Sequence, residues 1–193
     1  MSSSTGEASG PSAGQGRGRA SARDEALVRF ERLARERAFG LDVGSDRLIF
    51  AGPDVLLADV DSPSLALLAG LTRAEEPAAR ALFDLVTEES VLSFRPPEDP
   101  RERRWALARW IAARVVDGSW DPAAGVFTLA FEIGEDLGRP GELARLVECA
   151  HLMEAWDWGE RPRNTTHEQC VREAVEAARR FLERRPATTT PAH

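Results

Sequence analysis

The sequence contains no lysine and no tyrosine, and all 25 of its basic residues are arginine. Without lysine the chain cannot form a Schiff base, anchor pyridoxal phosphate covalently or supply the phosphate-binding lysine of a P-loop. Because alanine and arginine are both used heavily, we attribute the composition to a GC-rich bacterial genome. The sequence therefore excludes the reaction classes that depend on a lysine amine.

Cysteines and long apolar runs are also scarce. Two cysteines are too few to hold a chain of 193 residues together as a disulfide scaffold. No run approaches the roughly 18 uninterrupted apolar residues of a membrane span, and the N-terminus lacks the apolar run of a signal peptide. A net charge of −7 argues against a nucleic-acid partner, which needs a basic stripe. We therefore expect a cytoplasmic protein that binds neither nucleic acid nor membrane.

The distribution of apolar residues predicts one domain between two tails. Residues 1–21 are rich in serine and glycine and carry almost no bulky apolar side chains, which predicts a disordered tail. Residues 22–185 are predicted to form a single, mainly α-helical domain of about six helices. Residues 186–193 are predicted to be a disordered C-terminal tail.

Apolar residues recur at helical spacing through most of this domain, and cap residues precede several of the runs. Residues 47–60 are the exception, because two apolar runs flank the turn signal Ala51–Asp54 and together predict a small β-hairpin. Residues 122–134 fit both a strand and a helix, and we predict a helix because Asp121-Pro122 is a specific helix start. The predicted helices span residues 22–39, 72–90, 101–117, 122–134, 143–156 and 165–182.

The stretch VVDGSWDPAAG (residues 115–125) collects residue types that are common in binding sites. It fails as a calcium-binding loop, because Pro122 stands where that loop needs a glycine. It also lacks the several glycines and the lysine of a phosphate cradle. As a junction between two helices it is consistent throughout, with Gly118 as the stop, Asp121 as the cap and Gly125 for close packing.

Four residues have the chemistry of zinc ligands: Cys149, His151, His167 and Cys170. His167 and Cys170 are three apart and share a helix face, but Cys149 and His151 are two apart and do not. The spacing matches none of the usual zinc patterns. A Cys/His nucleophile pair also lacks a strained elbow and a third orienting residue. We therefore expect buried structural cysteines, and no metal or other cofactor.

Five tryptophans are the other candidates for function. Trp156 and Trp158 are two residues apart on a predicted helix, so both rings cannot be buried together, and an exposed indole is a typical anchor in a protein interface. We predict Trp120, Trp156 and Trp158 as interaction residues. Two alternatives stay open: Trp105, Trp110 and Trp120 belong to the core, or a pocket is lined by Trp105, Trp110 and Trp156.

A resemblance covers residues from about Leu65 to Leu182. The segment LAGLTRAE (residues 68–75), followed by the pair Trp105 and Trp110 and then by GSWDPAAG (residues 118–125), resembles a pattern found in a group of small helical proteins of actinobacteria. The resemblance implies an all-helical chain, a helix at residues 122–134 and an actinobacterial source. It implies no activity, cofactor or binding residue.

The chain is thus rich in capping and packing signals and lacks a convergent set of reactive residues. This combination predicts a non-catalytic cytoplasmic interaction module, such as an accessory or immunity-type protein, whose partner is another protein. The alternative is a small enzyme or small-molecule-binding protein with a pocket of tryptophans, arginines and acids. The sequence leaves the oligomeric state open.

Overall fold

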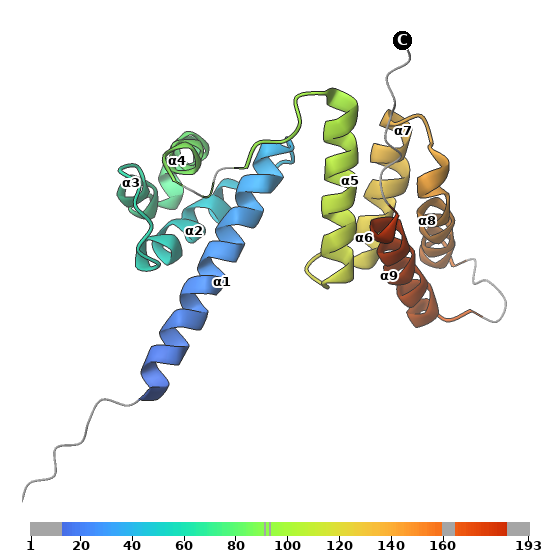
Figure 1. Ribbon diagram of the computed structural model, residues 1–193, viewed down its shortest axis with the longest axis horizontal. Coiled ribbons are helices and arrows are strands. Elements are labelled where there is room, and N and C mark those ends of the chain that lie inside the picture. Colours follow the sequence, from blue (N-terminus) through green and yellow to red (C-terminus); the bar gives the residue numbers. More distant parts are fainter. Residues whose placement is uncertain (1–12, 91, 93, 160–164, 185–193) are drawn as a thin grey trace, which may run out of the picture. The chain divides into compact units, whose positions relative to one another are not determined.

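Every regular element in the described part of the chain is a helix, which confirms the predicted mainly α-helical class (Figure 1). The computed structural model describes residues 13–90, 92, 94–159 and 165–184. Most of the N-terminal tail, the loop 160–164 and the C-terminal tail therefore lie outside the described residues. The chain divides into two units after Arg95. The single domain over residues 22–185 stays a prediction, and each unit is described by itself.

The N-terminal unit begins with a helix that is longer than predicted. Helix α1 starts at Ala13, so residues 13–21 of the predicted tail are helical, and it ends before Gly40, whose φ is +82°. The helix predicted from residue 72 begins with a capping box, in which the Thr72 amide donates to Glu75 Oε2 at 3.0 Å. The elements of this unit are α1 (Ala13–Ala38), α2 (Ser45–Leu57), α3 (Leu65–Ala69), the 3-10 turn η1 (Arg73–Glu75) and α4 (Glu76–Glu89).

The β-hairpin predicted at residues 47–60 is not formed, because α2 runs through its first strand, its turn and half of its second strand. Leu48, Ala51 and Val55 are buried at spacings of three and four, which is the period of a helix and not of a strand. Pro53 lies inside α2, where proline typically costs about 3 kcal/mol. Burial of the apolar face offsets this cost, and local turn chemistry could not reveal that tertiary contribution.

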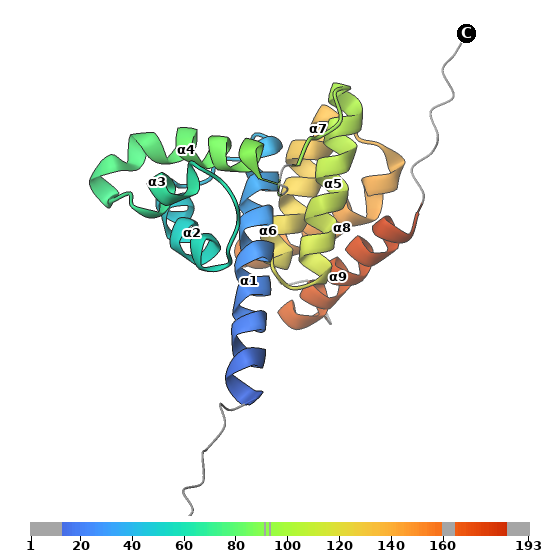
Figure 2. The ribbon, with the colours of Figure 1, turned by 60° about the vertical axis from the view of Figure 1, so that its left-hand side comes forward.

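Helix α2 is the centre of the unit, because it packs against α1, α3 and α4 (Figure 2). Gly52 allows a close approach to α3: a Cβ atom at Gly52 would lie 3.0 Å from the Cα of Ala69. Phe30 of α1 and Phe83 of α4 meet in the same core with ring centroids 4.5 Å apart. Each such fully buried side chain stabilises the fold by about 1.5–3 kcal/mol. The buried core comprises Phe30, Leu33, Ala34, Val43, Leu48, Ile49, Ala51, Val55, Leu65, Leu68, Ala79, Phe83 and Val86.

Glu89, the last residue of α4, ties the loop before α3 to the unit. Its carboxylate accepts hydrogen bonds from the Ser62 hydroxyl at 2.7 Å, from the Ser64 amide at 2.9 Å and from the Ser64 hydroxyl at 2.7 Å. The bond from Ser62, followed by those from Ser64, lowers the pKa of Glu89. Both serines of this loop are thus engaged by Glu89, and α3 begins after them at Leu65.

The C-terminal unit is built on α9, which packs against α5, α6 and α8. The helical prediction for residues 122–134 is confirmed, but its second half is a π-helix that the sequence pattern did not predict. In the part of the chain that the structure describes, no helix is long and apolar enough to cross a membrane. The elements are α5 (Pro100–Val116), α6 (Pro122–Phe127), the π-helix η2 (Thr128–Ile133), α7 (Gly134–Asp136), η3 (Gly141–Leu143), α8 (Ala144–Asp157) and α9 (His167–Glu183).

The stretch at residues 115–125 forms the predicted helix junction. Gly118 has a φ of +76° after the end of α5, and the Asp121 carboxylate accepts a hydrogen bond from the Ala124 amide at 2.9 Å at the start of α6. A Cβ atom at Gly125 would lie 2.2 Å from Cγ2 of Val115. Every role assigned to this stretch is confirmed.

We predict that Gly125→Ala destabilises the protein by about 1–3 kcal/mol, because the added methyl group overlaps the buried Val115 side chain. Chemical denaturation followed by circular dichroism measures the free energy of unfolding. Gly141→Ala is the matched control, since a Cβ atom there meets nothing within 4 Å. Equal effects of the two substitutions would contradict the close packing of α6 on α5.

The depressed pKa of Glu89 predicts a pH dependence. A carboxylate whose pKa is lower in the folded state contributes stability above its unfolded pKa, and this contribution is lost as the pH falls through the folded pKa. We therefore expect the free energy of unfolding to fall less steeply in Glu89→Gln than in the wild type between about pH 5 and 3. Glu88→Gln, at the exposed neighbouring position, should keep the wild-type slope. A wild-type slope in Glu89→Gln would sink this prediction.

Candidate functional site

Aromatic side chains from two segments of the C-terminal unit meet on its surface. Phe127 ends α6, Phe131 lies in η2 and His151 lies on α8, against which both segments pack. The ring centroids of Phe127 and Phe131 are 4.7 Å apart, and those of Phe131 and His151 are 5.1 Å apart. Both contacts are edge-on, the geometry that aromatic pairs favour. Phe127 remains 46% exposed, so the three rings form a continuous surface and not a core.

Trp158 extends this surface along α8. It follows the last residue of the helix and is 79% exposed. Because Trp158 is seven residues after His151, the two side chains leave α8 on the same face, about 10 Å apart along its axis. We call Phe127, Phe131, His151 and Trp158 the aromatic row.

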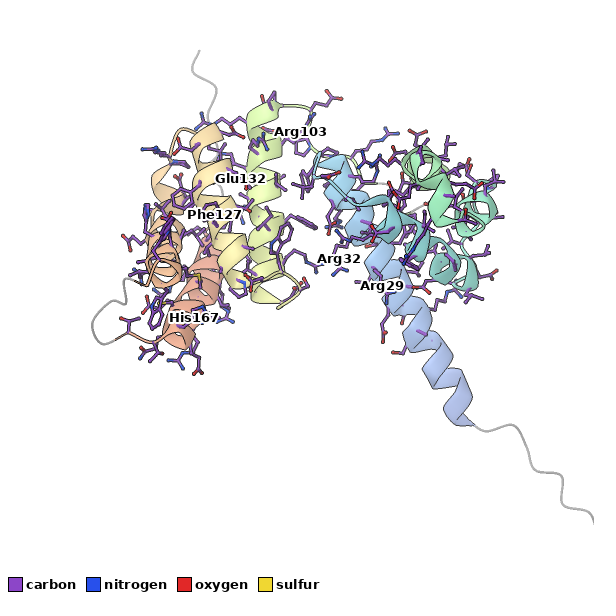
Figure 3. All side chains as sticks on the ribbon, turned by 180° about the vertical axis from the view of Figure 1, so that it is seen from behind. Arg29, Arg32, Arg103, Phe127, Glu132 and His167 are labelled. Atoms are coloured by element: carbon purple, nitrogen blue, oxygen red, sulfur yellow. The ribbon has the colours of Figure 1, made fainter. Side chains whose placement is uncertain are left out.

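The π-helix η2 sets the spacing of the side chains along the α6–η2 part of the aromatic row. Its last turn is closed by Gly134, whose amide donates to the Leu129 carbonyl five residues earlier. A Cβ atom at Gly134 would lie 3.2 Å from that oxygen, so glycine fits this position best. A π turn brings residues five apart, rather than four apart, close together. Phe127 and Glu132 have this separation, and Figure 3 labels both on the helix that α6 and η2 form.

The surroundings of the aromatic row carry negative charge. Glu154 Oε2 lies 3.6 Å from Nδ1 of His151, and Glu132 is exposed without an ion pair to any described residue. The nearest arginine along α8, Arg145, is already engaged by Glu148 at 2.6 Å and by Glu173 at 2.8 Å. The hydrogen bond to Glu148 is the main cause that raises the pKa of Arg145. The row therefore combines π surfaces with carboxylates that have capacity to accept hydrogen bonds.

The three tryptophans predicted as interaction residues lie in different environments. Trp120 is half-buried, and its ring meets Trp110 edge-on with centroids 5.7 Å apart. Trp156 is also half-buried and contacts the ring of His167, which begins α9, at 6.1 Å. Trp158 alone among these three is strongly exposed. The structure thus favours Trp158 as a contact residue and gives Trp120 a packing role in the helix junction.

The residues of the predicted pocket each take a separate partner. Trp105 stacks on Phe181 with centroids 6.2 Å apart, whereas Trp110 contacts Trp120 and Trp156 contacts His167. The pocket stays a prediction. Two shallow grooves, of about 470 and 460 Å³, are lined without any tryptophan: one by residues of α1, α4 and the segment after it, the other by residues of α8 and α9.

The four residues with zinc-ligand chemistry are split between core and surface. Cys149 and Cys170 are buried, whereas His151 and His167 are exposed and face aromatic rings. Within the ranges that the structure describes, no group of three or more histidines, cysteines and acids is arranged to hold a metal ion. Burial raises the pKa of the Cys149 thiol, which makes this residue a poor nucleophile.

Phe127 and Phe131 lie at the surface, although the sequence did not predict them there. The signal was present, because Val126, Leu129, Ala130 and Ile133 form a second apolar stripe that is buried instead. Only one of the two stripes can face the core. The choice between them depends on tertiary packing, such as the close approach of Gly125 to Val115, which the residue pattern of the segment does not predict.

Comparison with known proteins adds no family to this geometry: no family model matches the chain, and neither the curated proteins nor the solved structures include a match. The resemblance to actinobacterial helical proteins therefore stays a hypothesis. Any proposal about function rests on the residues of the chain itself.

The exposure of Trp158 predicts its response to a neutral quencher. We expect acrylamide to quench its fluorescence most strongly, so that Trp158→Phe lowers the apparent quenching constant of the protein more than Trp105→Phe does. Steady-state fluorescence titration of both variants and the wild type measures the difference. If Trp105→Phe produced the larger decrease, the position of Trp158 in the aromatic row would be wrong.

Proposed function

We propose that the chain is a non-catalytic, cytoplasmic protein-interaction module and that the aromatic row is its contact surface. The observation that carries the proposal is the 79% exposure of Trp158, together with the surface cluster that Phe127, Phe131 and His151 form. Tryptophan and other aromatic residues are enriched at the centres of protein interfaces, where truncating one often costs more than 1–2 kcal/mol of binding.

The composition of the aromatic row favours binding over chemistry. Phe127, Phe131 and Trp158 have no group that attacks a substrate, and His151 contacts a phenyl ring and the Glu154 carboxylate. Single exposed apolar residues are ordinary on protein surfaces, but contiguous apolar surface is typical of an interaction site. The aromatic rings supply contact area at a small cost in side-chain entropy, and Glu132 and Glu154 supply a polar rim.

In this proposal the chain is an accessory or immunity-type protein, which acts by occupying a surface of its partner. Three of its rings, those of Phe127, Phe131 and His151, are already held by contacts within the unit. Such preorganisation limits the entropy lost on binding. The small-molecule pocket at Trp105, Trp110 and Trp156 is the second hypothesis.

The proposal is tested with Phe127→Ala/Trp158→Ala. Wild type and variant are used to enrich partners from extracts of the native host, and the purified partner is then titrated by calorimetry. We expect the double variant to bind about 100-fold more weakly, because it removes two exposed anchors. Leu85→Ala, which truncates an exposed leucine of α4, should bind as the wild type does.

Two results would contradict the proposal. A partner that binds the double variant as tightly as the wild type would remove the aromatic row from the interface. If no partner is found and a small molecule instead raises the melting temperature of both proteins, the pocket hypothesis gains.

A further inference from the structure

Helix α2 of the N-terminal unit carries an apolar stripe on the face that points away from its core. Phe50, Pro53 and Leu57 are spaced by three and four residues, and Asp46 lies four residues before Phe50, so all four share one side of the helix. Phe50 is 59% exposed and Leu57 is 86% exposed. We call Phe50, Pro53 and Leu57 the α2 stripe. It belongs to the other unit from the aromatic row.

The α2 stripe is not a by-product of packing. The opposite face of α2 already supplies Leu48, Ala51 and Val55 to the core, and nothing in that role requires large apolar side chains outside. Leu56 on α2 and Leu67 on α3 are exposed as well. Pro53 has no N–H to donate to the carbonyl of Ile49, so this side of the helix also gains capacity to accept hydrogen bonds.

The ends of the α2 stripe are acidic. Asp46 lies in the first turn of α2, and Asp59 and Asp61 follow its last turn; no described residue forms an ion pair with any of the three. On the side of α2 that faces α1 the charges are neutralised by ion pairs. Arg29 pairs with Asp54 at 2.6 Å, and Arg47 pairs with Glu36 at 2.9 Å. Figure 3 labels Arg29 on α1.

One cation, Arg73, borders the α2 stripe. Its guanidinium carbon lies 5.8 Å from the centre of the Phe50 ring, in cation–π contact. One guanidinium against three carboxylates leaves the border net negative. The ring of Phe50 thus already binds one guanidinium. A cation from a partner could contact the same ring and the unpaired carboxylates beside it.

This charge pattern distinguishes among three kinds of binding partner for the α2 stripe: a second copy of the chain, an anionic lipid surface and a basic helix. In a pair of α2 helices from two copies, Asp46 would face either Asp46 or the Asp59–Asp61 segment, so like charges would meet in both orientations. An anionic lipid surface would be repelled in the same way. A helix with an apolar face and cations at both ends would match the apolar side chains and the carboxylates together.

We therefore propose that the α2 stripe binds a basic amphipathic segment of another protein. Asp46 and Leu57 are eleven residues apart, about 17 Å along the helix axis. A helical partner of matching length places its apolar residues at spacings of three and four and its lysines or arginines about 11–14 residues apart. This surface is a second binding site, in addition to the proposed contact through the aromatic row.

The experiment uses the full chain and a designed probe. The probe is a fluorescein-labelled helical peptide of about 18 residues with leucines on one face and two lysines at each end; a second peptide carries glutamates in place of the lysines. Fluorescence anisotropy measures binding at low and high salt. We expect the lysine peptide to bind, the glutamate peptide to bind at least tenfold more weakly, and high salt to weaken the lysine peptide.

Variants locate the binding on α2. Phe50→Ala/Leu57→Ala should weaken the lysine peptide at least tenfold, and Asp46→Asn/Asp61→Asn should weaken it several-fold and reduce its salt dependence. Val28→Ala is the matched control, because Val28 is also 59% exposed but lies on α1 outside the stripe. Circular dichroism verifies that each variant is folded. The Phe127→Ala/Trp158→Ala variant should bind the peptide normally, which keeps this test separate from that of the proposed function.

Five outcomes would overturn the proposal. Four of them are no binding of the lysine peptide, equal binding of the glutamate peptide, an equal loss with Val28→Ala, and a dimer in sedimentation equilibrium that Leu57→Ala dissociates. The dimer would make a second copy the occupant. Binding to vesicles of anionic phospholipid that Phe50→Ala/Leu57→Ala abolishes would instead make a membrane surface the occupant.

Discussion

The close approach of helices at glycine is the constraint on which both units depend. In the N-terminal unit Gly52 brings α2 against the backbone of α3, and in the C-terminal unit Gly125 admits the Val115 side chain between α6 and α5. A methyl group at either position would meet atoms at 3.0 Å or less. Since tightly packed interiors tolerate such overlap poorly, these two contacts fix which faces of α2 and α6 are inside.

The candidate surfaces follow from this choice of inner faces. Once Gly52 faces α3, helical geometry requires the side of α2 that carries Phe50 and Leu57 to face away from the core. In the C-terminal unit the buried residues after Gly125 leave Phe127 outside, where it meets Phe131 and His151. In each unit, therefore, the helix face that packs inside also determines which side chains lie at the surface.

Local signals in the sequence predicted the parts of the fold that local chemistry determines. The caps at Thr72 and Asp121 and the stop at Gly118 were foreseeable, because each acts within a few residues. Helix α2 was not, since Ala51–Asp54 carries a turn signal that only long-range burial overrides. Of the tryptophans predicted to mediate interactions, Trp158 is exposed, as its spacing from Trp156 suggested. The half-burial of Trp120 depends on its contact with Trp110 of the neighbouring helix α5, which local spacing does not reveal.

The π-helix at residues 128–133 can be understood as a helix that holds one residue too many. An α turn closes over four residues and a π turn over five, so deleting a single residue there would restore an ordinary helix. Because the wider turn absorbs the extra residue, the helical turns before and after it would keep their orientation. In evolutionary terms, a one-residue length change in this segment alters the side chains shown within it while the helix on either side persists.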